Sequence, residues 1–178
     1  MVEEAVPRAK RAEMKVRRSA REKSAQVRAD VTRDAELVRL MKKAGCQVMF
    51  IGFESVNPQS LKAMKKGQTV AEIARAVKVL RRARIRIHGM FVFGFDEDDW
   101  RTVRRTVRFA KRARLTSSQF MILTPLPGSD FYSQVCRQQR IRFRDWNLYD
   151  AHHVVFEPSK LAPLDLQRAQ IYCHRKFY

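Results

Sequence analysis

Three short segments of this chain combine oxygen-bearing side chains with glycine or proline, and each could contact a polar small molecule. They read Gly52-Phe-Glu54-Ser55, Phe93-Gly94-Phe95-Asp96 and Thr124-Pro-Leu-Pro-Gly128. A carboxylate such as Glu54 can accept hydrogen bonds from both hydroxyls of a ribose, as acidic residues do in dinucleotide sites. The backbone around Gly94 and along residues 124–127 can pair with the edge of a flat base, with Phe95 or Leu126 against its face. Together these segments predict a nucleotide-like ligand.

The three segments are expected to lie together because each one follows a predicted β-strand. The predicted strands span residues 25–31, 48–53, 85–93 and 118–123, and helical patterns separate them. This alternation predicts right-handed βαβ units and a parallel sheet, in which ligands bind beyond the carboxyl ends of the strands. Residues 48–53 carry no polar side chain, which is typical of a strand covered on both faces.

Local signals place the helices between these strands. One helix is expected to open near Asp34 and to end before Gly45, and Asn57-Pro58 supplies an N-cap and a first-turn proline for a short helix. Residues 69–72 form a capping box for the next helix. The acidic residues 97–99 are expected to place negative charge at the start of a further helix, and a last helix begins near Pro163.

Composition excludes several classes of protein. The chain has 178 residues, with 37 Lys and Arg against 18 Asp and Glu, so its formal net charge is +19. No apolar run is long enough for a transmembrane helix, no secretory signal is visible, and three cysteines make no disulfide framework. A reducing cytoplasm is therefore expected. The basic residues are spread along the chain, which favours a solvated arginine-rich surface over nucleic-acid binding.

Other reactive side chains support weaker hypotheses. His152 and His153 lack a third ligand at metal-binding spacing, so no metal site is predicted there. His88 lies inside a predicted strand and is interpreted as a structural histidine. Cys46 has no activating neighbour in the sequence and is interpreted as a buried thiol. These residues leave the catalytic groups unknown.

Several linked motifs resemble the second half of a radical SAM enzyme. They are FIGFESVNPQSLKAMKKGQT, HGMFVFGFDED, QFMILTPLPGS, DWNLYD and HHVVFEP, and the resemblance covers residues 24–178. The most similar subgroup is the type whose long members carry a cobalamin-binding domain before the barrel. The resemblance implies an α/β fold, namely an incomplete β/α barrel of about four parallel strands with outer helices. It also implies S-adenosyl-L-methionine (SAM) and a 4Fe-4S cluster as cofactors, with cobalamin in a full-length parent.

The resemblance also implies cofactor-binding roles for individual residues. Glu54, with Ser55 beside it, matches the position that touches the SAM ribose, and Lys66 matches a basic position near the SAM carboxylate. Gly94 and Phe95 match the glycine motif beside adenine, whereas Gln26 and Arg28 would face the amino-acid end of SAM. The adenine pocket itself would be lined by Thr124, Pro125 and Leu126.

One departure from the family pattern is severe. The family holds its cluster through CxxxCxxC, whereas the cysteines here are Cys46, Cys136 and Cys173. Three thiolates must converge on one cluster, and residues this far apart in sequence do not form that motif. The chain is therefore expected to begin near the third barrel strand, to leave one sheet edge unpaired and to be inactive alone.

The expected domain organisation follows from this departure. Residues 1–23 are expected to form a basic arm, residues 24–130 the third to sixth barrel strands, and residues 131–178 a C-terminal extension. The expected partners are an unknown small-molecule substrate and the missing N-terminal half of the barrel. Two alternatives stay open, namely a residual SAM or adenine-nucleoside binding module, and a basic nucleic-acid-binding domain that uses the arginine face of residues 101–112.

Overall fold

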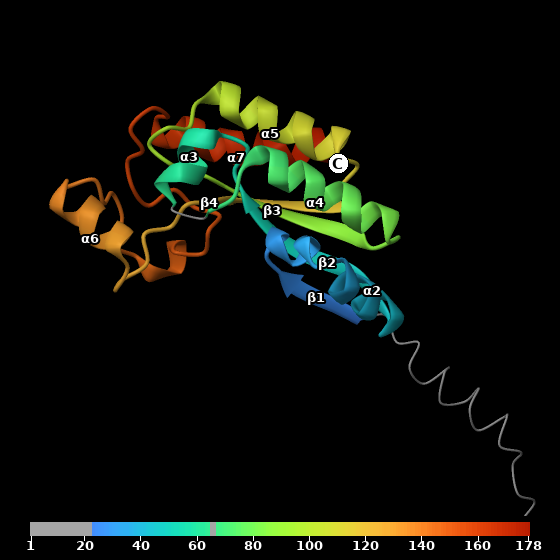
Figure 1. Ribbon diagram of the computed structural model, residues 1–178. Helices are drawn as coiled ribbons and strands as arrows, with labels where there is room; N and C mark the ends of the chain where they lie inside the picture. The colour runs from blue at the N-terminus through green and yellow to red at the C-terminus, as the bar shows by residue number, and fades with distance from the viewer. Residues whose placement is uncertain (1–22, 65–66) are drawn as a thin grey trace, which may run out of the picture.

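A four-stranded parallel sheet organises the structure, a computed structural model that describes residues 23–64 and 67–178. The strands are β1 (Lys23–Val27), β2 (Cys46–Glu54), β3 (Arg86–Phe93) and β4 (Ser117–Ile122). They lie in the order β1-β2-β3-β4, and every neighbouring pair is parallel (Figure 1). The sheet does not close, so the predicted incomplete β/α barrel with about four parallel strands is confirmed.

The first strand differs from its prediction. Residues 25–31 were expected to be extended, but β1 ends at Val27 and the 3-10 helix η1 (Ala29–Arg33) follows. The Thr32 hydroxyl donates to the Ala29 carbonyl oxygen at 2.8 Å, and Ala29 is buried. This local turn competes with strand continuation, because a threonine side chain can satisfy a backbone carbonyl that a neighbouring strand would otherwise pair.

Local capping signals locate the helices more accurately. Asp34 caps α2 (Ala35–Lys43), Asn57 caps α3 (Pro58–Ala63), and Thr69 and Glu72 complete the predicted capping box of α4 (Val70–Arg82). Asp99 caps α5 (Trp100–Arg112). The remaining helices are α6 (Asp130–Arg137), the 3-10 helix η2 (Trp146–Leu148) and α7 (Pro163–Phe177).

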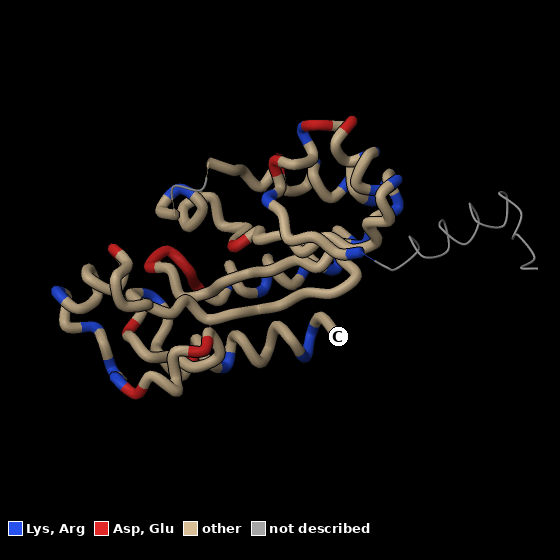
Figure 2. Tube along the Cα trace, turned by 90° about the horizontal axis from the view of Figure 1, so that it is seen from below, with Lys and Arg blue, Asp and Glu red and all other residues tan. Residues whose placement is uncertain are grey.

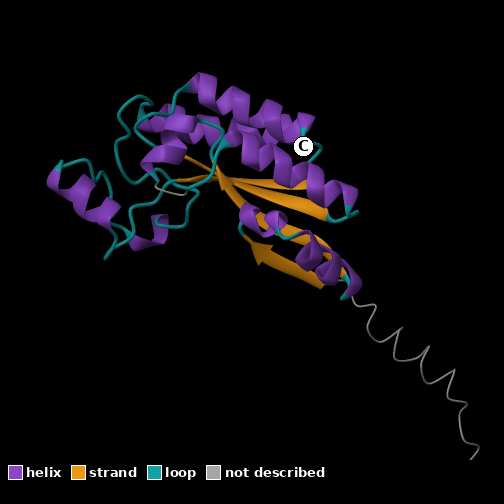
Figure 3. Cartoon of the chain, in the orientation of Figure 1, coloured by secondary structure: helices purple, strands orange, loops and turns teal. Residues whose placement is uncertain are grey.

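Among the described residues, helices cover one face of the sheet and not the other. Met49, Ile51 and Phe53 point into this side of β2 and are fully buried, in one core cluster with residues of α2, α4, α5 and α7. The alternate residues Val48 and Phe50 stay partly exposed and lie outside that cluster. The prediction that residues 48–53 are covered on both faces is therefore wrong for the described chain. Both faces of the segment carry apolar residues, but helices cover one of them. Figure 3, in the orientation of Figure 1, shows the long helices α4, α5 and α7 on one side of the strands, while α6 lies apart from them.

The two edge strands of the sheet, β1 and β4, differ in how far other residues cover them. At the outer edge of β4, the Tyr178 hydroxyl bonds both the N–H and the carbonyl oxygen of Ser118, at 3.0 and 3.1 Å. Gln170 of α7 donates to the Phe120 carbonyl oxygen, and Ile122 N–H donates to the Ala151 carbonyl oxygen. No described residue makes a comparable bond to the outer edge of β1.

The basic residues of α5 lie where the sequence predicts them. Val103, Val107 and Ala110 are buried, whereas the arginines of the opposite face are exposed: Arg101, Arg104, Arg105, Arg108 and Arg112. Figure 2 shows basic positions spread over several described elements. Among the helices that the structure describes, none is both long and apolar enough to cross a bilayer.

Candidate active-site rim

The carboxyl ends of β1 to β4, with the loops that follow them, form one edge of the sheet, which we call the rim. The predicted residues Glu54, Gly94-Phe95 and 124–126 follow the neighbouring strands β2, β3 and β4, so the fold brings them to this edge. A backbone hydrogen bond connects the ends of β3 and β4, where Leu123 N–H donates to the Phe93 carbonyl oxygen at 2.8 Å. Lys66, the predicted basic contact, lies outside the described residues.

At the end of β2 the chain reverses sharply. Glu54 has a φ of 59°, and Ser55 N–H donates to the Phe53 carbonyl oxygen at 2.7 Å. The Ser55 hydroxyl accepts from Asn57 N–H at 3.0 Å, and Ser55 is buried. Left-handed backbone is costly for a residue with a side chain and persists where the surroundings enforce it. Ser55 therefore holds the turn, while the partly exposed Glu54 carboxylate can reach a ligand.

The β3 end is organised by Asp98, a residue that the sequence analysis placed only at a helix start. Its Oδ2 accepts from Gly94 N–H and Phe95 N–H at 3.1 and 3.2 Å. Its Oδ1 accepts from the Ser60 hydroxyl of α3 at 2.8 Å, and the residue is only 1% exposed. Burial raises the pKa of Asp98 to about 6, against the opposing effect of these hydrogen bonds. The helix cap is Asp99 instead.

Gly94 is required at this turn for two reasons. Its φ is +117°, which side chains rarely tolerate, and an added Cβ would lie 3.1 Å from the Leu166 side chain. Because Asp98 already takes the Gly94 and Phe95 N–H groups, a bound base would have to use other groups at the rim. The Phe95 ring is partly exposed at this position.

The segment after β4 is a tight turn. Thr124 donates its hydroxyl to the Ile122 carbonyl oxygen at 3.1 Å, and Pro125 is buried. The Leu126 side chain is 54% exposed, while its carbonyl oxygen accepts from the Ser129 N–H and hydroxyl. An exposed leucine on a fixed turn provides an apolar surface for a flat ring.

The C-terminal extension is anchored to the rim through an ion pair that the sequence did not predict. Both guanidinium NH2 groups of Arg140 donate to the Asp96 carboxylate, and its Nε donates to the Glu157 carbonyl oxygen at 2.6 Å. Ser159 N–H adds a bond to Asp96 at 3.3 Å. The Arg140 guanidinium keeps the pKa of the Asp96 carboxyl below its usual value. Asp96 therefore fastens this extension beside Gly94 and Phe95.

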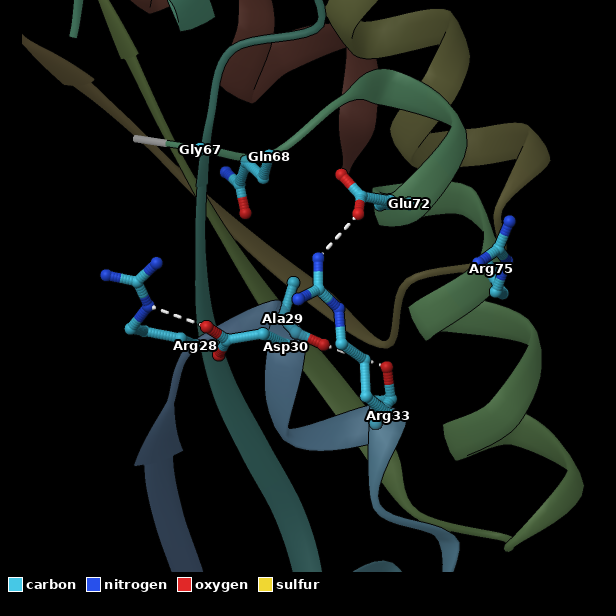
Figure 4. A pocket seen from close by; sticks show the side chains of 9 residues that line it. Arg28, Ala29, Asp30, Arg33, Gly67, Gln68, Glu72 and Arg75 are labelled. Carbon is cyan, nitrogen blue, oxygen red and sulfur yellow. Dashed lines mark hydrogen bonds and ion pairs between the residues drawn. The ribbon is translucent and has the colours of Figure 1, made fainter. Parts of the chain in front are cut away.

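A polar pocket of about 320 Å³ lies at the β1 end of the rim (Figure 4). Two ion pairs cross it, Arg28 with Asp30 at 3.1 Å and Arg33 with Glu72 at 2.6 Å. Gln68 also lines the pocket and donates to the Phe53 carbonyl oxygen at 3.0 Å, which connects it to the β2 turn. Arg28 thus lies at the rim, whereas Gln26 is an exposed residue of β1.

The cysteines do not fit a 4Fe-4S cluster. Cys46 is buried at the amino end of β2, opposite the rim, while Cys136 and Cys173 lie on α6 and α7. Burial raises the pKa of the Cys46 and Cys173 thiols, which disfavours the thiolate that a metal needs. No group of three His, Cys, Asp or Glu residues suited to a metal occurs in the described chain.

The two histidines near residue 152 are engaged locally. His153 Nδ1 lies 2.9 Å from Asp150, and His152 Nδ1 lies 3.2 Å from the Gln170 side chain.

Comparison with known proteins identifies the fold and the family. The model of the family described as "Radical SAM superfamily" matches residues 3–110, and so extends into residues before the start of the resemblance at 24. Bacteriochlorophyllide d C-12(1)-methyltransferase of Chlorobaculum tepidum is 38% identical over 144 residues, which cover 80% of this chain and 31% of the relative. The anaerobic magnesium-protoporphyrin IX monomethyl ester cyclase of Cereibacter sphaeroides is 27% identical over 149 residues, 84% of this chain and 24% of the relative. The chain thus spans about a third or less of these relatives.

Solved structures agree with the fold. Coproporphyrinogen III oxidase from Escherichia coli, a radical SAM enzyme, matches with a TM-score of 0.63 and 14% identity, covering 96% of this chain and 38% of the other. The radical SAM methyltransferase TsrM from Kitasatospora setae, with cobalamin and a [4Fe-4S] cluster bound, matches with a TM-score of 0.59 and 21% identity. That match covers 82% of this chain and 30% of the other. From the family match over residues 3–110, the chain belongs to the radical SAM superfamily.

Proposed function

We propose that this chain provides the SAM-binding rim and the substrate-facing sheet of a radical SAM enzyme that acts on a tetrapyrrole. The observation that carries the proposal is the one-sided sheet, whose rim combines Glu54, the Gly94 turn and exposed Leu126 beside an uncovered strand face. The relatives named above supply the substrate class, because they methylate or cyclise bacteriochlorophyllides and magnesium-protoporphyrin. The family match does not favour the alternative of a nucleic-acid-binding domain.

In this proposal each rim group has a separate role toward SAM. The Glu54 carboxylate accepts hydrogen bonds from the ribose hydroxyls, with Ser55 holding its turn. Gly94, Phe95, Thr124 and Pro125 shape the adenine pocket. Leu126 packs against the adenine ring. Lys66 remains the candidate contact for the SAM carboxylate.

In this proposal the chain supplies no ligand to the 4Fe-4S cluster. Its three cysteines are all free and lie on three different elements, so it is inactive alone in this proposal. The cluster ligands would come from a segment outside the described residues that pairs along the outer edge of β1, and cobalamin has no assigned residue in this chain. Free cysteines agree with a reducing, cytoplasmic location.

Calorimetry with S-adenosylhomocysteine tests the rim directly. We expect measurable heat with the 178-residue chain and none with Glu54→Ala, because the ribose loses its acceptor. Glu36→Gln is the matched control, since Glu36 is an exposed acidic residue of α2 that pairs with Arg39. Equal heats for the native chain and Glu54→Ala would refute the assigned role of Glu54.

Anaerobic iron–sulfur reconstitution tests the missing cluster. The chain alone should bind no stoichiometric cluster and release no 5′-deoxyadenosine from SAM. Co-expression with the amino-terminal part of the Chlorobaculum methyltransferase should yield a complex that contains a cluster. A stoichiometric cluster on the isolated chain would overturn this part of the proposal.

A further inference from the structure

The C-terminal extension exposes aromatic side chains that have no role in the proposed rim. Among the described residues, three large aromatic side chains are more than half exposed, namely Phe143, Trp146 and Tyr178. The Tyr178 hydroxyl bonds the β4 edge, which gives that residue a structural role. Phe143 and Trp146 lie outside the core cluster of the described chain. Exposed apolar groups that lie close together often mark a binding site.

A closed turn holds these two aromatic residues together. The Tyr149 hydroxyl donates to the Phe143 carbonyl oxygen at 2.9 Å, and the Tyr149 ring lies 4.8 Å from the Trp146 ring. Trp146 is the first residue of η2, which Asp145 caps. We call Phe143, Arg144, Trp146 and Tyr149 the aromatic patch. Because bonds within the turn already fix it, the patch loses little conformational freedom when a ligand binds.

The aromatic patch lies beside the rim. Phe143 N–H donates to the Val155 carbonyl oxygen at 3.2 Å, and Ile141 forms an antiparallel bridge with Phe156. The Phe156 ring is so close to the β3 turn that a Cβ at Gly94 would lie 3.5 Å from it. One strand spacing of about 4.8 Å and one residue step of about 3.3 Å separate the backbones of Phe143 and Phe156. In Figure 1, α6 and the chain after it lie beyond the ends to which the strand arrows point, so a ligand on the patch is within reach of the rim.

Arg144 adds a positive charge to the aromatic patch. Among the described residues no carboxylate lies within ion-pair distance of Arg144, whereas Arg142 approaches Glu157 at 3.6 Å. Burial raises the pKa of the Tyr149 hydroxyl and the Arg144 charge opposes this rise, so the guanidinium lies near that hydroxyl. A guanidinium can bind a carboxylate through two parallel N–H donors. The patch therefore suits an anionic ligand with flat apolar rings.

A protoporphyrin-type macrocycle has this combination of properties. Its ring system is flat and apolar, and carboxylates project from its edge. Tryptophan and phenylalanine rings offer a large contact area to such a ligand at a low cost in side-chain entropy. Arginine and tryptophan are also the residues that most often dominate the free energy of binding at a protein surface.

We propose that the aromatic patch binds the tetrapyrrole substrate, with the macrocycle stacked on Trp146 and Phe143 and one of its carboxylates paired with Arg144. The inference rests on the proposed function, from which the substrate class comes. It adds the residues that hold the macrocycle at the rim end of the sheet. The ion pair of Asp96 with Arg140 fastens the extension to the rim, and so keeps the bound substrate beside SAM.

Titration with protoporphyrin IX, followed by its Soret absorbance in dilute detergent, tests the patch without the iron–sulfur cluster. Trp146→Ala should weaken binding about tenfold, because a stacked aromatic anchor is lost, and Phe143→Ala should act in the same direction. Ile171→Ala is the matched control, because Ile171 is an exposed apolar residue of α7. Its affinity should stay within about twofold of that of the native chain. Circular dichroism verifies that every variant folds.

Protoporphyrin IX dimethyl ester isolates the role of Arg144. Esterification removes the carboxylate charges and keeps the macrocycle. Arg144→Gln should therefore lower the affinity for the free acid about fivefold and change the affinity for the ester less than about twofold. Because both ligands are titrated into the same protein sample, a folding defect cannot produce this difference. Arg104→Gln, which changes an exposed arginine of α5, should leave both affinities unchanged.

The outcomes separate this inference from the proposed function. Equal affinities of the native chain, Trp146→Ala and Phe143→Ala for protoporphyrin IX would overturn the inference and leave the proposed function standing. An equal loss of affinity for acid and ester in Arg144→Gln would overturn the assigned ion pair. A native chain that binds no protoporphyrin IX would overturn the tetrapyrrole class and the patch together. The calorimetric test with S-adenosylhomocysteine does not involve the patch, so failure of the rim proposal is recognised separately.

Discussion

The Ser60 hydroxyl donates to Oδ1 of Asp98 at 2.8 Å across 38 residues of sequence, and both side chains are buried. This bond joins α3, which follows β2, to the turn that follows β3. Because Oδ2 of the same carboxylate accepts from Gly94 and Phe95, one acidic side chain holds the β3 rim segment and connects it to α3. The rim geometry therefore depends on a residue that need not contact any ligand.

Replacing Asp98 by Asn is expected to stabilise the protein at pH 8. The Asn oxygen can accept from Gly94 and Phe95 N–H and its amide can donate to Ser60, without a buried charge. Since burial raises the pKa of Asp98 from 3.8 to about 6, the charged form costs about 3 kcal/mol at pH 8. Thermal unfolding of native chain and Asp98→Asn, measured side by side, gives the difference.

The sign of the pH dependence follows from this raised pKa. Between about pH 4 and 6 the folded state holds a proton that the unfolded state has released, so the contribution of Asp98 to stability falls as pH rises. The advantage of Asp98→Asn should therefore be largest at pH 8 and shrink toward pH 4. Asp98→Ala should instead destabilise at every pH, because two buried N–H groups lose their acceptor. An Asn variant less stable than the native chain at pH 8 would contradict the prediction.

The sequence predicted contacts between residues close in the chain and missed a contact between residues far apart in it. The caps at Asp34, Asn57 and Thr69 were predicted because the capping side chain and its backbone partner are at most three residues apart. The burial of the Asp98 side chain was not predicted. Its partner Ser60 is far away in sequence, and the neighbouring Asp99 satisfies the same helix-start pattern.

The sequence already separates the two faces of β3. Ile87, Phe91 and Phe93 alternate with His88 and Met90, which already places His88 on the face opposite the core. What the sequence could not indicate is that no helix covers that face in the described chain, because continuous apolarity is the same whether the second face meets helices or a ligand.

Neutralising Asp96 should loosen the C-terminal extension. Asp96→Asn removes the charge that Arg140 binds, and the side chains are 34% and 16% exposed, so we expect a loss of about 1 kcal/mol. Amide hydrogen exchange should increase in residues 138–159. The pKa of Asp96 is lowered in the folded state, so this stabilisation is present above about pH 4 and lost as pH falls further.

A second ion pair provides the control for Asp96. Arg142 and Glu157 approach at 3.6 Å and both are more than half exposed, so Arg142→Gln should change stability by less than about 0.5 kcal/mol. Equal exchange in Asp96→Asn and the native chain would show that the extension does not depend on the ion pair of Asp96 with Arg140.

Removing the Tyr178 hydroxyl should open the β4 edge. Tyr178→Phe leaves the Ser118 N–H and carbonyl without their partner, which costs about 1 kcal/mol. Exchange of the Ser118 amide should accelerate while the β2 amides keep their protection. Tyr149→Phe is the matched control, because that hydroxyl donates to the Phe143 carbonyl oxygen at an exposed position. A Ser118 amide that stays protected in Tyr178→Phe would mean that the edge is closed by α7 itself.

Adding one methyl group at Gly89 should destabilise the core. A Cβ there would lie 2.6 Å from Cδ1 of Leu115 and 3.1 Å from the Phe53 ring, so Gly89→Ala forces both side chains to move. Overpacking of this kind costs about 1–3 kcal/mol, which denaturant unfolding measures. Leu115→Val removes the methyl carbon that clashes, and the double variant should recover part of the loss although Leu115→Val alone is destabilising. Strictly additive losses in the double variant would show that Leu115 is not the obstacle and that the Phe53 ring limits the space.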